Sequence, residues 1–255
     1  MPTLREFIAN ADRTLNFFTL GRVTSPVLVD LFGFMGGFDG FWLDQEHSGL
    51  TYEQMLVATA AGRGHGFYSF VRAAPVNYAI VTQCLEAGAD GVMAAQVNSA
   101  AHAEEFVQWA KFSPRGVRGM NNGGRDALYA GKPVKQFAEE SNRDSMVAIQ
   151  IETAQSLNEV DAIAAIPDVD MLFVGPSDLS QSLGVVGELE HDKVWEGYEQ
   201  VAAAAKKHGK VWGTVPASPA AAQRHRELGC RMLTFASDVG CLRAGIAAVK
   251  EKFGA

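Results

Sequence analysis

The chain has 255 residues, 47% hydrophobic and 20% charged, a balance typical of a soluble globular protein with a sizeable core. Its formal net charge of −7, with no basic stripe to offset it, argues against nucleic acid as a partner. The three cysteines lack metal or disulfide spacing, no apolar run approaches membrane-spanning length, and the first residues do not resemble a signal peptide. We therefore expect a cytoplasmic protein with no membrane partner.

Short apolar runs alternate with amphipathic segments along the whole chain. Such runs, separated by helices, are typical of buried parallel strands in βαβ units. They predict eight strands, each followed by a helix, and hence a single-domain (β/α)8 TIM barrel of the α/β class over residues 1–255. A doubly wound open sheet is the alternative, because the sequence does not show closure. The predicted strands are 16–23, 38–43, 67–71, 91–97, 146–151, 171–174, 211–215 and 232–236.

Capping residues mark where several helices begin. Ser25 and Pro26 open the first predicted helix, and Thr51 with Gln54 resembles a capping box for the next. One amphipathic helix, 157–166, is expected between the fifth and sixth strands. These signals support the alternation of strand and helix.

Two segments have features beyond this alternation. The irregular stretch 113–132 contains several glycines and three arginines, Arg115, Arg118 and Arg125. Long loops in compact domains are often lids or binding segments, so these arginines either bind an anion or face the solvent. The closing helix, 241–253, has an apolar face that packs on the barrel wall or on a neighbouring molecule.

Carboxylates follow two adjacent predicted strands. Glu152 ends the fifth strand and Asp178 comes soon after the sixth. In a barrel these strand ends share one face, where active sites form. Buried carboxylates need a compensating cation, and oxygen ligands suit Mg²⁺ or Mn²⁺. Arg72, at the end of the third strand, could instead neutralise one carboxylate as a structural salt bridge, so both interpretations stay open.

Other residues at these strand ends are candidates for proton transfer. An Asp–His pair such as Asp44 and His47 can act as an oriented general base, whereas a lone histidine more often bonds a backbone carbonyl. Ser177 is expected in a turn rather than as a nucleophile, since no histidine adjoins it. We discount a lysine Schiff base, because the only lysine near a predicted strand end is Lys210, at the start of the seventh.

Six motifs occur in an order that is similar to one known family. The most specific is VGPSDLSQSLG at 174–184, with IQIET upstream at 149–153. The others are GFDGFWLDQEH (37–47), FVRA (70–73), EAGADGVM (86–93) and SPRGVRG (113–119). Together they resemble the metal-dependent (class II) pyruvate aldolases of the HpcH/HpaI aldolase/citrate lyase group. The resemblance implies a (β/α)8 barrel that cleaves and forms 4-hydroxy-2-oxo acids from pyruvate, or a close 2-oxo acid, and an aldehyde.

The resemblance also implies roles for individual residues. It places a divalent metal, Mg²⁺ or Mn²⁺, on Glu152 and Asp178, and Arg72 on the enolate oxygen. His47 paired with Asp44 is similar to the acid/base dyad of the family.

Further residues resemble supporting elements of the family site. Glu46 would lie behind the metal ligands. Gln150 and the backbone around Ser177 and Asp178 are similar to the elements that hold pyruvate. A homo-oligomer, hexameric in the family, is implied as well.

Four positions depart from the family pattern. Gln45 replaces a glycine, Ala95 and Gln96 stand where a proline and an apolar residue are common, and Ser113 replaces a proline. These departures leave the identity of the natural aldehyde open. The alternatives are an acyl-CoA or carboxylate-forming lyase of the same family, and a ligand-binding barrel without catalysis.

Overall fold

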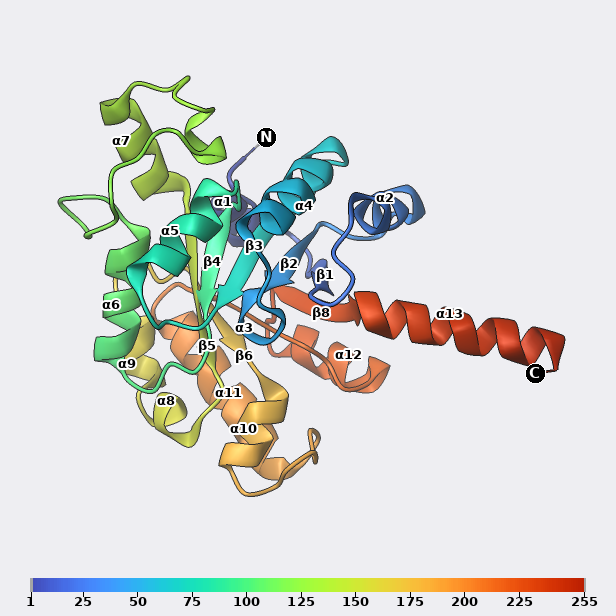
Figure 1. Ribbon diagram of the computed structural model, residues 1–255. Coiled ribbons are helices and arrows are strands. Elements are labelled where there is room, and N and C mark those ends of the chain that lie inside the picture. The colour runs from blue at the N-terminus through green and yellow to red at the C-terminus, as the bar shows by residue number, and fades with distance from the viewer. Residues whose placement is uncertain (1, 255) are drawn as a thin grey trace.

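The strands close into a parallel barrel. The computed structural model describes residues 2–254, in which eight strands pair in sequence order and β8 returns to β1 (Figure 1). The prediction of a (β/α)8 barrel is confirmed, and closure excludes the open sheet. The strands are β1 (Leu15–Leu20), β2 (Gly40–Asp44), β3 (Tyr68–Ala73), β4 (Gly91–Ala94), β5 (Met146–Ile151), β6 (Met171–Val174), β7 (Val211–Thr214) and β8 (Met232–Ser237).

The central strands β5 and β6 have their predicted bounds, whereas the predicted first strand extends too far. β1 ends at Leu20 rather than Val23. The amides of Arg22 and Val23 donate to the Asp238 carboxylate, both at 2.7 Å, and not to a neighbouring strand. Apolar periodicity cannot show this, because the competing acceptor lies more than 200 residues away in the sequence.

Alternate side chains of each strand fill the barrel interior or pack beneath the helices. The interior cluster is rich in aromatic and methionine side chains, including Phe17, Trp42, Phe70 and Phe173. This period-two alternation follows from strand geometry. It directs every second residue at a strand's carboxyl end towards the barrel axis, which is what brings the candidate site together.

Helices cover the outside of the barrel. The predicted capping box is confirmed: the Thr51 hydroxyl accepts from the Gln54 amide at 3.2 Å, and the Gln54 side chain accepts from the Thr51 amide at 2.9 Å. Pro26 occupies the first turn of its helix, as predicted. The covering helices are α2 (Pro26–Met35), α4 (Tyr52–Gly64), α5 (Tyr78–Glu86), α6 (Ala100–Ala110), α8 (Ala154–Asn158), α9 (Val160–Ala164), α11 (Asp192–Lys207) and α12 (Pro219–Glu227).

The prediction of one helix over 157–166 is wrong, because α8 and α9 meet at a break at Glu159. This residue has φ −103° and ψ 9°, outside the helical region. Its carboxylate accepts from the amide of Ala100 at 2.7 Å, at the start of α6. Glu159 thus satisfies a free amide of a neighbouring helix, a tertiary contact that local periodicity does not reveal.

Two short helices at the carboxyl end of the barrel were not predicted. α3 (Gln45–Ser48) follows β2 directly, and α10 (Pro176–Ser182) follows β6. Ser177, expected in a turn, therefore lies in the first turn of α10. Both helices are short, and short helices leave almost no periodic signal in a sequence.

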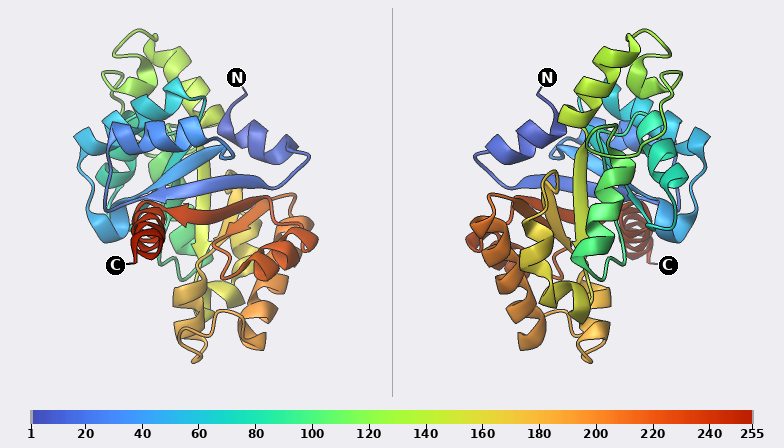
Figure 2. Two further views of the ribbon diagram at one scale, coloured as in Figure 1. Left: turned by 90° about the vertical axis from the view of Figure 1, so that its right-hand side faces the viewer. Right: turned by 90° about the vertical axis from the view of Figure 1, so that its left-hand side faces the viewer.

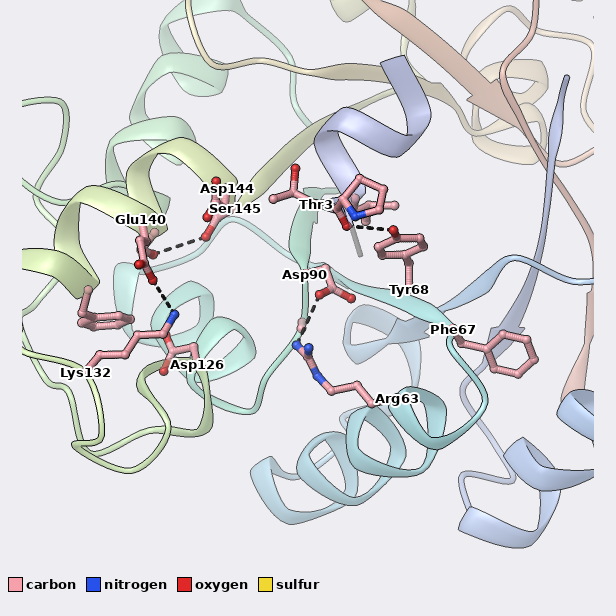
Figure 3. A pocket seen from close by; sticks show the side chains of 15 residues that line it. Thr3, Arg63, Phe67, Tyr68, Asp90, Asp126, Lys132, Glu140, Asp144 and Ser145 are labelled. Atoms are coloured by element: carbon pink, nitrogen blue, oxygen red, sulfur yellow. Dashed lines mark hydrogen bonds and ion pairs between the residues drawn. The ribbon is translucent and has the colours of Figure 1, made fainter. Parts of the chain in front are cut away.

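The amino-terminal end of the barrel is closed by α1 (Leu4–Asn10). Leu4 and Ile8 are each 1% exposed and join the interior cluster. A pocket of about 440 Å³ lies beside this helix. Figure 3 shows that its charged side chains pair with one another, Arg63 with Asp90 at 3.3 Å and Lys132 with Glu140 at 2.7 Å. This pocket lies at the opposite end of the barrel from Glu152 and Asp178.

The 113–132 stretch lies at this same end, next to α7 (Val134–Asp144), while α10 lies at the opposite end (Figures 1 and 2). Arg115 binds Glu104 at 2.7 Å and Asp168 at 2.8 Å. Arg118 binds Asp126 at 2.6 Å. These two arginines therefore hold the loop in place, and the loop is not a lid over the site of its own barrel.

A buried histidine makes the packing of α12 sensitive to pH. His225 is 1% exposed and is surrounded by the rings of Trp195, Tyr198 and Trp212, at centroid distances of 4.8, 4.3 and 5.8 Å. Burial, helped by the charge of Arg224, lowers the pKa of His225 to about 4. The folded protein therefore favours the neutral ring.

We expect acid to destabilise the protein through His225. The unfolded chain binds this proton below about pH 6.5, whereas the folded protein resists it until about pH 4, so stability present above pH 6.5 is lost as the pH falls through this window. The loss is at most about 3 kcal/mol. Urea unfolding at pH 7.5 and pH 4.5 should show a smaller difference for His225→Phe than for the wild type. His102→Phe, at a partly exposed histidine, should keep the wild-type difference.

The closing helix, α13 (Asp238–Phe253), does not pack on its own barrel. It extends away from the body of the molecule (Figure 1), and Asp238 is its only buried residue among those described. Its apolar residues Leu242, Ile246 and Phe253 are 43%, 61% and 75% exposed. Of the two packing partners considered from the sequence, the barrel wall is therefore excluded within one molecule. No helix within residues 2–254 combines the length and apolar character that a membrane span needs.

Candidate active site

The candidate residues meet at the carboxyl end of the barrel. Asp44 on β2 is in register with Arg72 on β3. Gln150 lies near the end of β5 with Glu152 just beyond it, and Asp178 lies in the first turn of α10 after β6. These residues lie on one rim, as predicted from the sequence, because parallel strands end at one face of the barrel and alternate side chains at these ends point inward.

Arg72 is held by two carboxylates. Its Nη2 lies 2.9 Å from Asp44 Oδ2, and its Nε donates to Asp44 Oδ1 at 3.1 Å and lies 3.3 Å from Glu46 Oε2. Asp44 and Arg72 are both buried, at 9% and 8% exposure. The structural salt bridge considered from the sequence is present, but with Asp44 and Glu46 rather than with the two carboxylates proposed to bind a cation. Nη1 of Arg72 has no partner within residues 2–254.

The structure does not pair the side chains of His47 and Asp44. Asp44 caps α3, and its Oδ1 accepts from the backbone amide of His47 at 3.2 Å. The carboxylate nearest the imidazole is Glu46, with Oε2 3.7 Å from Nε2. The His47 side chain is 54% exposed. It therefore lies at the mouth of the site, where it can reach a substrate.

Glu152 is 1% exposed at the centre of the site. Its Oε1 accepts from the backbone amide of Gln96 at 2.6 Å, and its Oε2 accepts from the Gln150 amide. Burial raises the pKa of Glu152 to about 7; the Gln96 amide lowers it, and the charges of Asp178 and Glu46 raise it further. A carboxylate in this environment favours a bound proton or a bound cation.

Three of the four departures from the family pattern lie at this end of the barrel, whereas Ser113 lies at the opposite end. Gln96 has a left-handed backbone, φ 50°, which aims its amide at Glu152, while its side chain is exposed. Ala95 is fully buried behind it. Gln45 begins α3 at the rim. Gln96 therefore acts on Glu152 through its backbone, and its side chain is free to face an incoming molecule.

A small cavity opens on the same rim, between Arg72, Gln150 and the first turn of α10. It has a volume of about 160 Å³, suited to a molecule of a few heavy atoms. Its polar lining residues are Arg72, Gln150, Ser177 and Asp178. Its apolar lining includes Trp42, Phe173, Leu189, Val215 and Pro216.

The site has features that fit a cation. Two buried oxygens, Glu46 Oε2 and Gln150 Oε1, have no hydrogen-bond donor within residues 2–254. A Cβ at position 175 would collide with Glu152 Oε2 and Gln150 Nε2, so Gly175 leaves this space open. Within the described residues no three His, Cys, Asp or Glu side chains are grouped to hold a metal. A cation would therefore have two carboxylate ligands, with the remaining positions left to water or substrate.

Two residues of the site were not identified from the sequence. In the sequence, Gly175 and Trp42 stand out only as members of the motifs at 174–184 and 37–47. Trp42 lines the cavity, and it lies two residues before Asp44 on β2. Strand alternation puts residues two apart on the same face, so this spacing was the available signal.

Comparisons with known proteins agree on one family. The sequence profile of the HpcH/HpaI aldolase/citrate lyase family matches residues 23–244. A 5-keto-4-deoxy-D-glucarate aldolase from Klebsiella pneumoniae is 29% identical over 91% of this chain and 89% of its own length. A 4-hydroxy-4-methyl-2-oxoglutarate aldolase from Hapsidospora irregularis is 35% identical over 78% of this chain and 74% of its own.

Solved structures give the same result. A protein of this family from Burkholderia cenocepacia has a TM-score of 0.89 and 30% identity, covering 97% of this chain and 98% of its own. A citrate lyase β subunit from M. tuberculosis, solved with oxaloacetate and magnesium, shares the fold at TM-score 0.58 and 18% identity, over 91% of this chain and 93% of its own. The named relatives are aldolases, which are lyases, so the interpretation as a barrel without catalysis is set aside. The chain is an enzyme and belongs to the HpcH/HpaI aldolase/citrate lyase family.

Proposed function

We propose that the protein is a metal-dependent aldolase that cleaves a 4-hydroxy-2-oxo acid into pyruvate, or a close 2-oxo acid, and an aldehyde, and catalyses the reverse. The observation that carries this proposal is the arrangement of Arg72. Its guanidinium is fixed by two carboxylates, its Nη1 makes no hydrogen bond within residues 2–254, and Arg72 lines the cavity together with Asp178. Such an unpaired, preorganised donor suits an oxygen on which negative charge grows during a reaction.

Glu152 and Asp178 are the proposed ligands of a divalent cation, Mg²⁺ or Mn²⁺. The raised pKa of Glu152 and the buried Gln150 Oε1, which has no hydrogen-bond donor within residues 2–254, support a cation at this position. When bound, the cation would supply Lewis-acid polarisation of the substrate's keto group. Glu46, which touches Arg72 and His47, would support the site from behind.

The side chains of this chain then have distinct tasks in cleavage. His47 takes the proton of the C4 hydroxyl, the C3–C4 bond breaks, and its electron pair passes to the pyruvate fragment as an enolate. Arg72 donates to the enolate oxygen through Nη1. Gln150 and the first turn of α10, with Ser177 and Asp178, hold the carboxylate end of the small acid in the cavity. The proton that His47 has taken up is returned, through solvent, to C3 of the enolate, which completes pyruvate and restores the neutral imidazole, and the aldehyde leaves from the mouth.

The acyl-CoA alternative has less support. An acyl-CoA lyase needs a surface that binds the nucleotide part of coenzyme A, and the clustered arginines of the 113–132 loop were the candidate for it. Arg115 and Arg118 are occupied by Glu104, Asp168 and Asp126, at the opposite end of the barrel. A location in the cytoplasm stays a prediction of the sequence.

The proposal is tested by pyruvate release. Metal-stripped protein is mixed with 4-hydroxy-4-methyl-2-oxoglutarate, the 2-oxo acid named in one relative, and Mg²⁺ or Mn²⁺ is titrated in while pyruvate is measured. This compound has a methyl group on C4, so both fragments of its cleavage are pyruvate, the second in place of an aldehyde. We expect no pyruvate without metal and saturable release with it. A rate of pyruvate release that does not depend on the metal concentration would contradict the proposal.

Arg72→Lys should slow the exchange of pyruvate methyl protons with heavy water. Lysine keeps the charge but loses the planar fork that binds Asp44 along one edge. Losing one such preorganised donor typically lowers a rate by about 10²–10³-fold. Proton NMR of the pyruvate methyl group measures the rate. Arg63→Lys, at the opposite end of the barrel, is the matched control and should exchange like the wild type.

A homo-oligomer, hexameric by family resemblance, is also proposed. α13 presents its apolar face to solvent, and α2 leaves Leu31, Phe34 and Met35 exposed at 54%, 79% and 83%. Apolar areas of this kind mark protein contacts. A second copy of the chain could cover both by exchanging α13 with its partner.

Light scattering at micromolar concentration should therefore give a mass well above 27.4 kDa. Leu242→Glu with Ile246→Glu puts two charges on the apolar face of α13 and should lower this mass. Ala244→Glu, on the other face of the same helix, should not. A wild-type protein that runs as a monomer would refute the oligomer.

A further inference from the structure

Arg72 has a third contact, besides its two carboxylates. Its Cζ lies over the ring of Trp42, 4.8 Å from the centroid. We infer that Trp42 is a positioning residue, which holds the guanidinium of Arg72 in the orientation that leaves Nη1 for the substrate. The inference rests on the proposed function for its rate effects, but the contact itself can be tested without any reaction.

Trp42 is itself fixed within the barrel. Its Nε1 donates to Thr234 Oγ1 on β8 at 3.0 Å, and the two residues are 5% and 2% exposed. Phe70 stacks beside it with centroids 6.4 Å apart, and Phe173 meets it edge-on at 6.3 Å. The indole is thus held at its polar edge and by its neighbours, so its face has one orientation towards Arg72.

The three contacts restrain different parts of the guanidinium. Asp44 and Glu46 bind the atoms Nε and Nη2 from the rim. The Trp42 ring covers one face from inside the barrel, where the attraction between a cation and an aromatic face is strongest because water is excluded. Without the ring, both carboxylates could keep their bonds while the plane of the guanidinium tilts into the barrel. The carboxylates therefore fix the position of Arg72, and Trp42 fixes its plane.

Trp42 also borders the cavity directly, together with Gln150 and Asp178. It forms the floor beneath the place where the small acid is proposed to bind. Its neighbours in the barrel interior include the apolar rings of Phe70 and Phe173, and the Thr234 hydroxyl is occupied by the indole Nε1. An indole at this position keeps water from reaching Arg72 from below, which strengthens its interaction with a developing negative charge.

The rate test uses pyruvate methyl-proton exchange in heavy water with Mn²⁺. Trp42→Leu should lower the rate by about 3- to 30-fold, the range of a desolvated cation–π contact. Trp42→Phe keeps an aromatic face and should recover most of the loss. Trp212→Leu removes another buried tryptophan, whose Nε1 donates to Leu228 O at 3.4 Å, and should exchange like the wild type.

A double-mutant cycle separates positioning from simple packing. Because Trp42 also lines the cavity, the cycle compares rates at saturating pyruvate. In an Arg72→Gln background there is no cation to hold, so Trp42→Leu should change this rate less than about 2-fold, since the losses of two coupled residues are not additive. If the two losses multiply instead, Trp42 does not act through Arg72 and the inference is overturned.

The second test needs no turnover. A guanidinium over an aromatic face is shifted upfield by the ring current, so ¹⁵N-edited NMR should show the Arg72 Nε proton upfield of its usual position. Trp42→Leu should return it to that position, and Trp212→Leu should not. An unshifted Arg72 signal in the wild type would refute the contact. If instead the signal is shifted but no variant exchanges pyruvate protons, the proposed function fails while the contact stands.

Discussion

Glu152→Gln and Asp178→Asn are each expected to abolish aldol cleavage and metal binding. Each change removes one of the two charged oxygen ligands that the site offers to a cation, and a divalent ion held by a single carboxylate binds weakly. The fold should persist. Glu152 has a pKa raised to about 7 by burial, so a neutral amide at this position relieves a strained charge rather than creating one.

The measurement combines calorimetric Mn²⁺ titration with the pyruvate-release assay, and far-ultraviolet circular dichroism checks the fold. Glu188→Gln, at an exposed acid on the loop after α10, should bind metal and turn over like the wild type. Full activity in a metal-stripped Glu152→Gln sample would show that neither the carboxylate nor the ion takes part.

His47→Ala should lower the rate of cleavage by about 10²–10⁴-fold, the usual span for a positioned general base. Metal affinity should stay near the wild-type value, because the His47 side chain touches only Glu46 among the carboxylates. Steady-state cleavage and Mn²⁺ titration measure the two quantities on the same samples. His65→Ala, which removes a histidine paired with Asp30 on the outside of the barrel, should leave both unchanged. Loss of the ion in His47→Ala would make this histidine a metal ligand instead.

Asp44 distinguishes the two interpretations of the His47 environment. The first interpretation is an Asp44–His47 dyad, in which the carboxylate orients the imidazole. The second is that Asp44 only fixes Arg72. In the structure the Asp44 carboxylate binds the Arg72 guanidinium and the backbone amide of His47, not the imidazole. The defect of an Asp44→Asn variant should therefore resemble that of Arg72→Lys.

The barrel could be predicted from the sequence because its signals are local. A buried apolar run such as Met146–Ile151 forms a strand, and a cap such as Thr51 with Gln54 starts a helix. Both are determined by residues that are close together in the sequence. The rim followed from the same signals, since parallel strands deliver Glu152 and Asp178 to one face. What escaped prediction depends on contacts between distant segments. The helix breaks at Glu159, whose carboxylate accepts a hydrogen bond from the first amide of α6. Strand β1 ends early because the backbone amide of Arg22 donates to Asp238 instead of to a neighbouring strand.

The site was predictable as a set of residues but not as a network. Spacing brought Asp44, Glu46 and Arg72 together, but it could not tell which carboxylate would bind the guanidinium. The sequence left open that Arg72 would neutralise one of the two proposed metal carboxylates, and the family resemblance placed it on the enolate oxygen. Its partners are instead Asp44 and Glu46, and Trp42 lies beneath it. Choices among near neighbours depend on rotamers and on fractions of an ångström, which strand periodicity does not encode.

The central claim is that the cation and Arg72 together stabilise the enolate of pyruvate. This half-reaction needs no aldehyde, so it does not depend on the acceptor side, where Gln45 and Gln96 depart from the family pattern. The direct measurement is the proton NMR signal of the pyruvate methyl group with wild-type enzyme and Mg²⁺ or Mn²⁺ in heavy water. We predict that the signal decays far faster than with metal alone, as deuterium replaces the methyl protons. A decay no faster than the metal-only control would contradict the account.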